Sequence, residues 1–163
     1  MSDHLREALE KVLNEYDARR AAEQARVRRL EEEAEEFQER FRALRKDVVR
    51  PVLEAAGAIL AERGHGFSIT EEEYSAAAGA RPVEAGISFH VTPAGSGPAA
   101  QASDHTRTFS VSTRHYNRMV NIDAGAAMSE GGMVGSKAAY PPERVDRQLI
   151  EEALVRFVAG VVR

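Results

Sequence analysis

The chain has 163 residues, enough for one hydrophobic core but not for two. Its apolar content of 43% and charged content of 29% are typical of a folded protein with extra charged helix surface. A net charge of -4 gives no global reason to expect nucleic acid or an anionic membrane as a partner. The absence of cysteine excludes disulfides, thiol catalysis and thiolate metal sites, and it fits a cytoplasmic location.

Neither a secretion signal nor a membrane anchor is expected from the sequence. The first residues are charged from the third position onward and contain no apolar core of signal-peptide length. The unbroken apolar runs elsewhere are only a few residues long, which is too short to cross a bilayer. We therefore expect a soluble protein.

The first third of the chain predicts one long helix. Residues 5–49 contain no glycine or proline and consist largely of Ala, Leu, Glu, Arg and Gln, which have high helix propensities. Pro51 lacks a backbone donor and clashes with the preceding turn, so we expect a kink or a restart there. A further helical segment is predicted over residues 51–63, before Gly64 and Gly66 end it.

After Gly66 the period of the apolar residues changes from the helical 3.6 to the alternation of a strand. Strands are predicted over residues 67–70, 83–92, 107–113 and 118–123. The glycine-rich segments 93–105 and 125–140 are expected to be connections. A last helix, residues 142–162, has a wide apolar face that we expect to pack on the sheet.

These elements predict an α+β fold: a long coiled-coil-like N-terminal helix with a proline kink, an antiparallel meander of three or four strands, and a C-terminal helix on the sheet. We assign residues 1–50 to an oligomerisation region and residues 51–163 to a small α+β domain. A helix of this length exceeds what one small domain can cover, so part of it should project or pair.

The long helix contains an apolar seam with the alternating three- and four-residue spacing of a coiled coil. Its members are Val27, Leu30, Ala34, Phe37, Phe41, Leu44 and Val48. Leu9, Leu13 and Tyr16 keep the same phase, but Arg20 and Glu23 interrupt it. The seam predicts self-association of the chain.

Charges beside the seam favour an antiparallel homodimer through residues 26–48. This arrangement opposes three pairs of unlike charge, whereas a parallel dimer would oppose two arginines. The expected antiparallel pairs are Arg26 with Asp47, Glu33 with Arg40, and Glu31 with Arg45. Two alternatives stay open: the seam packs on the chain's own sheet, which two phenylalanines at seam positions support, or it binds a different chain.

No catalytic or metal-binding motif stands out. The five histidines show no HxH or HxxxH spacing, and no serine lies in a nucleophile elbow. The segment 131–137 resembles a phosphate-binding loop only briefly, because Ser136 precedes Lys137 and the glycine spacing is too short. We therefore predict no catalytic residue, no metal and no cofactor.

A basic hairpin over residues 105–118 is the candidate anion-binding site. It combines Arg107, Arg114, His115 and Arg118 with no acid from 105 to 118, and Tyr116 lies in the turn. Three arginines are few in an acidic protein, so an ordinary polar hairpin is the simpler interpretation. Nucleic acid is accordingly an improbable partner.

Three functions follow from the sequence, in descending order of support. The first is a non-enzymatic, self-associating interaction or scaffold protein, with a further protein partner as an option. The second is a nucleic-acid or phosphate-ligand binder that uses the basic hairpin. The third is an enzyme whose site forms between subunits. An exposed apolar patch on the open sheet face would favour the first, and a buried His or Arg in a closed pocket would favour the third.

Overall fold

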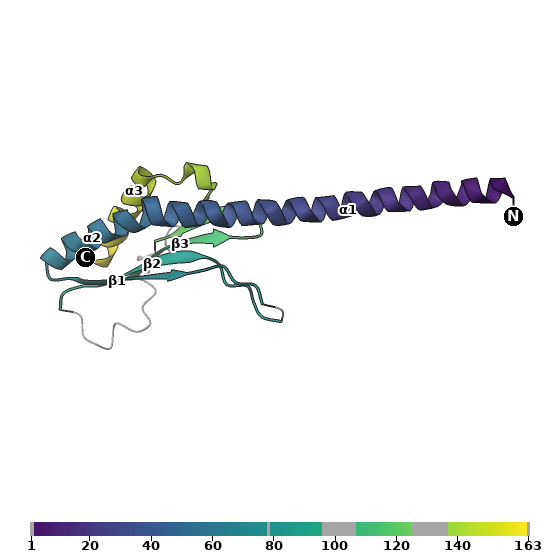
Figure 1. Cartoon of the computed structure of the whole chain (residues 1–163). Coiled ribbons are helices and arrows are strands. Elements are labelled where there is room, and N and C mark those ends of the chain that lie inside the picture. The colour runs from purple at the N-terminus through teal and green to yellow at the C-terminus, as the bar shows by residue number, and fades with distance from the viewer. Residues whose placement is uncertain (1, 78, 96–106, 125–136, 163) are drawn as a thin grey trace, which may run out of the picture. The chain divides into compact units, whose positions relative to one another are not determined.

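The computed structural model describes residues 2–77, 79–95, 107–124 and 137–162. Its packing divides the chain into two compact units, Met1–Glu36 and Phe37–Arg163 (Figure 1). The boundary expected from the sequence, between the long helix and the α+β domain, was at residue 50. None of the helices in the described ranges combines the length and the apolar content that crossing a bilayer requires.

The first unit is helical and strongly exposed. Helix α1, Asp3–Leu44, begins with Ser2, whose Oγ accepts a hydrogen bond from the Leu5 amide at 3.2 Å. Every described residue up to Glu33 is exposed to solvent. The helix therefore has no core of its own within this unit, and its stability there comes from helix propensity and local charge pairs.

The helix that enters the second unit changes its winding before Pro51. A π-helical turn, η1, spans Arg45–Val49, and α2 continues from Arg50 to Glu62. The Arg50 amide bonds to the Arg45 carbonyl, an i→i−5 bond that widens the turn. Because the Pro51 ring would clash with the carbonyl four residues earlier, the wider turn is where the expected irregularity lies.

Helix α2 ends in a glycine motif. Gly64 adopts a φ of 84°, the His65 amide bonds to the Leu60 carbonyl, and the Gly64 amide bonds to the Ala61 carbonyl. This pair of bonds is a Schellman motif, which satisfies the last carbonyls of the helix and turns the chain toward the sheet.

The sheet has five antiparallel strands in chain order, one more than the three or four expected. Its strands are β1 (Gly66–Glu72), β2 (Gly86–Thr92), β3 (Thr108–Arg114), β4 (Met119–Asp123) and β5 (Lys137–Tyr140). The additional strand β5 pairs with β4 and lies in a segment expected to be a connection. β2 begins at Gly86 rather than at residue 83, because Val83 forms an isolated bridge with Ser75.

The C-terminal helix is shorter than the sequence indicated. A 3-10 turn, η4, occupies Pro142–Arg144, and α3 spans Arg147–Val161. Asp146 caps α3, since its Oδ1 accepts from the Leu149 amide at 2.8 Å. Val145 before the cap and Ile150 in the first turn are both buried, which is the pattern of a hydrophobic staple.

One face of the sheet, together with the helices, forms the core of the second unit. Phe89, Phe109 and Val111 are fully buried, and the Phe109 and Phe157 rings lie 5.8 Å apart, which places α3 on the sheet as expected. Figure 1 shows α2 and α3 on the same side of the strands. The α+β class, the long helix, the antiparallel meander and the C-terminal helix are thus confirmed.

Helix α2 and strand β1 approach each other closely at Gly57. A methyl group added there would come within 2.4–2.6 Å of the Phe67 ring in β1. Gly160 in α3 has nothing within 4 Å of such a methyl group. The two glycines therefore offer a matched pair of helical positions.

We predict that Gly57→Ala lowers the free energy of unfolding by about 1–3 kcal/mol, because the ring must move. Gly160→Ala should leave it unchanged or raise it by up to about 1 kcal/mol, the gain in helix propensity. Urea denaturation followed by circular dichroism would measure both. Equal effects at the two positions would show that the contact with Phe67 does not constrain the packing.

Candidate self-association surface

The predicted seam is divided between the two units. Phe37 and Phe41 are 4% and 0% exposed and belong to the core of the second unit, against which Leu44 and Val48 also pack. In the first unit, Val27 and Leu30 are 42% and 39% exposed, and Ala34 is half-buried. The alternative of packing on the chain's own domain therefore describes the later half of the seam.

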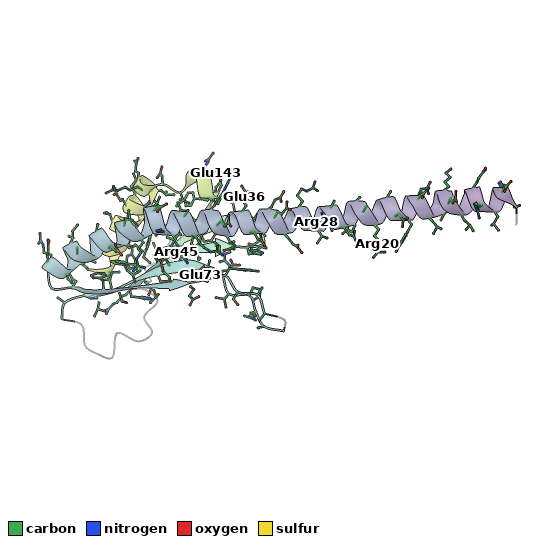
Figure 2. The ribbon with its side chains drawn as sticks, in the orientation of Figure 1. Arg20, Arg28, Glu36, Arg45, Glu73 and Glu143 are labelled. Atoms are coloured by element: carbon green, nitrogen blue, oxygen red, sulfur yellow. The ribbon has the colours of Figure 1, made fainter. Side chains whose placement is uncertain are left out.

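The charge expected to pair across the dimer at Arg45 is used inside the second unit. Arg45 is buried; its Nη1 donates to the Glu72 carbonyl at 2.9 Å and to the Gly86 carbonyl at 3.4 Å. Its Nη2 bonds to the Glu73 carboxylate, beside which it lies in Figure 2, and its Nε is 3.6 Å from Glu71. Arg45 is thus not a rim charge free to meet Glu31 of a second copy.

The Arg45 guanidinium also sets the ionisation of its partner. The hydrogen bond from Arg45 has the largest effect and lowers the pKa of Glu73; burial opposes it, and the charges of Arg45 and Arg42 lower the pKa further. A carboxylate with a lowered pKa stabilises the fold above its unfolded pKa of about 4.3, and this contribution is lost as the pH falls through the folded value.

An apolar stripe lies on the earlier part of α1 and includes Leu9, Leu13 and Tyr16, which the sequence places in phase with the seam. Its members are 45–58% exposed: Leu5, Leu9, Val12, Leu13 and Tyr16. Their spacing of four, three, one and three residues places them along one side of the helix. Together with Val27 and Leu30, they are the largest set of exposed apolar side chains on the described part of the first unit.

The basic hairpin does not gather its charges at one point. Arg107 precedes β3 and Arg114 ends it, so the strand separates them by about 23 Å at 3.3 Å per residue. With its amide turned to satisfy both groups, Asn121 accepts from Arg114 Nε at 2.7 Å. Arg118 adopts a φ of 52° in the turn, and His105 lies outside the described residues. The anion-binding alternative stays an untested prediction.

His115 belongs instead to a polar cluster at the hairpin end of the sheet. Its ring stacks on Tyr74 with centroids 4.1 Å apart, and its Nδ1 accepts from Gln38 Nε2 at 3.3 Å. The His115 amide donates to both Glu84 oxygens, at 3.1 and 3.0 Å, and Thr113 Oγ1 donates to Glu84 Oε2 at 2.8 Å. Glu84 thereby continues the pairing beyond the first residue of β2 and the last residue of β3.

This cluster could not be found from the sequence. Gln38 and His115 are 77 positions apart, and Glu84 is 31 positions from His115. The residue types show no fixed spacing that marks such a contact. Gln38, Thr113 and Glu84 each bond to a group on another segment, so the arrangement holds the strand ends and the helix together.

The open sheet face carries small polar side chains. Ser88, Ser110 and Ser112 lie on it, and His90 is held between Thr70 at 3.3 Å and Thr108 at 3.0 Å. The described strands therefore do not present the apolar patch that would mark this face as a docking surface. No set of three or more His, Asp or Glu side chains within the described ranges is placed to hold a metal ion.

A second exposed apolar surface lies between α2 and α3. A groove of about 350 Å³ is lined by Ala56, Ile59, Leu60, Leu154, Val155, Val158 and Ala159. Ile59 and Val155 are strongly exposed at its rim. Both of these apolar surfaces, among the described residues, are thus formed by helices. Residues 131–136, part of the segment compared above with a phosphate-binding loop, lie outside the described residues.

Comparison with known proteins gives no match to a family model, to a curated protein or to a solved structure.

Replacement of Arg45 by methionine should lower the free energy of unfolding by about 2–4 kcal/mol, because two carbonyls lose their donor and an ion pair is broken. The pH dependence between about pH 3 and 5 should also weaken, since Glu73 loses the charge that lowers its pKa. Arg147→Met, which removes one exposed pair with Glu151, should cost no more than about 0.5 kcal/mol. Comparable losses for the two variants in chemical denaturation would contradict a structural role for Arg45.

Proposed function

We propose that this chain is a non-enzymatic, self-associating interaction protein whose long helix joins two copies in an antiparallel homodimer. The proposal rests on the exposed apolar side chains of the first unit. These are the stripe Leu5, Leu9, Val12, Leu13 and Tyr16, together with Val27 and Leu30. A second helix of the same kind would cover these side chains, which gain free energy on leaving water. The absence of cysteine fits a reducing compartment, so the proposal includes a cytoplasmic location.

The contacts made by the polar residues Arg45 and Glu84 support a non-catalytic function. Arg45 donates to main-chain carbonyls and acids, and Glu84 accepts from the main chain of the neighbouring strand. These groups hold the elements of the fold together. The groove between α2 and α3 supports a further protein partner, since its lining is apolar and Ile59 and Val155 stand at its rim.

The role of the stripe in self-association can be tested with two aspartate substitutions, one within the stripe and one on another side of the same helix. Leu13→Asp lies on the stripe and should raise the dimer dissociation constant at least about tenfold, because a carboxylate would be buried in the pairing surface. Ala18→Asp lies on another side of the same helix and should leave association unchanged. Sedimentation equilibrium of the full chain measures both, and circular dichroism confirms equal helix content.

A wild-type chain that stays monomeric at concentrations of about 100 μM would contradict the proposal, as would equal association by the two variants. Substitution of Phe41 is not informative for this purpose. Phe41 is fully buried in the second unit, so an aspartate there would unfold that unit as well as remove a seam residue.

A further inference from the structure

Two charged residues interrupt the apolar seam of the first unit. In the heptad that has Leu13 and Val27 at position a, Arg20 is also at a, and Glu23 is at position d with Leu9, Tyr16 and Leu30. Both are exposed in the single chain. A coiled coil would bring them to its centre, so their pairing decides which arrangement of two copies is stable.

Parallel and antiparallel pairing treat these two charges in opposite ways. In a parallel dimer each seam residue faces its own copy, so Arg20 would meet Arg20 and Glu23 would meet Glu23. In an antiparallel dimer position a faces position d, so Arg20 can face Glu23 of the other copy. The two-fold axis then produces this unlike pair twice.

The register that pairs these charges also pairs the apolar residues without a mismatch. If Arg20 faces Glu23, then Leu13 faces Leu30, Tyr16 faces Val27, and Leu9 faces Ala34. Each layer occurs twice. The two-fold axis passes between residues 21 and 22.

The charged residues beside the seam, at positions e and g, disfavour this register, but their effect is weak. The register brings Arg19 near Arg26 and Glu10 near Glu31, whereas a parallel pair would bring Arg26 near Glu31. Rim pairs are solvated and contribute little. Arg26 is also bonded to Glu23 of its own chain at 2.6 Å, and the Glu23 carboxylate has further lone pairs to accept from Arg20 of the other copy. Charges at the seam lose water on pairing, so a like pair there is much more unfavourable than a like pair at the rim.

The length of the exposed helix fits the same register. Residue 7 of one copy would lie opposite residue 36 of the other, so the paired segment is residues 7–36. Glu36 is the last residue of the first unit, and the buried Phe37 follows it. The register therefore uses the helix up to the point where its apolar residues become committed to the second unit, and it requires no buried side chain to leave the core.

We propose that two copies pair antiparallel over residues 7–36, with Arg20 of each copy bound to Glu23 of the other. This inference rests on the proposed self-association and specifies its partner, a second copy, and its register. It differs from the pairing expected from the sequence, which was centred near Phe37 and required Arg45 at the rim.

Cysteine cross-linking tests the orientation directly, because the chain has no cysteine of its own. A mixture of Leu13→Cys and Leu30→Cys chains should form a mixed disulfide dimer under mild oxidation. Each variant alone should not cross-link, since the antiparallel register separates two copies of residue 13 by about 25 Å along the helix. Efficient cross-linking of each variant with itself would overturn the antiparallel pairing.

Charge exchange at the seam tests the Arg20–Glu23 contact. Arg20→Glu should raise the dimer dissociation constant at least about tenfold, and Arg20→Glu/Glu23→Arg should restore it to within about threefold of the wild type. The control is Arg28→Glu, an equal change of charge at the outward-facing position b of the same helix, which should have little effect. No recovery in the double variant would overturn the contact.

The outcomes separate this inference from the proposed function. A wild-type chain that is monomeric in sedimentation contradicts self-association itself. A dimer that gives no mixed disulfide contradicts the register and leaves self-association intact.

Discussion

The burial of Phe37 and Phe41 is the constraint on which the arrangement of this protein depends. These two side chains, with Val49 and Leu53, belong to the same core as the inner face of the sheet. The last turns of α1 are therefore part of the second unit, although the helix that contains them starts far earlier in the chain. This division determines which apolar residues of the long helix can meet another molecule.

In the second unit, too, packing decides which side chains remain exposed. The sheet uses its apolar side chains against the helices and keeps serines, threonines and His90 on its open face. The buried polar side chains of Gln38, Arg45 and Thr113 bond to groups on other elements. Exposed apolar side chains remain mainly on helices, and such surfaces are recognised by other helices.

The sequence predicted the elements far better than it predicted their partners. Period and composition identify the long helix, four strands and the last helix, because each of these depends on local residues. β5 was missed because four residues with two central alanines show no alternation. The seam through Phe41 could not be assigned, since packing on a sheet and packing on a second helix require the same stripe. The contacts of Arg45 with Glu73 and of His115 with Gln38 join segments far apart in the chain, so the spacing of residues in the sequence does not predict them.

The π-helical turn at Arg45–Val49 contains one residue more than a regular α-helical turn, because its hydrogen bonds join residues five apart. Each residue of an α-helix advances the side chains by about 100° around the axis. The wider turn spreads its rotation over the additional residue, so the segments before and after it present their apolar residues to the same core. Phe37 and Phe41 can therefore pack with Val52 and Leu53, although the helix is not regular between the two pairs.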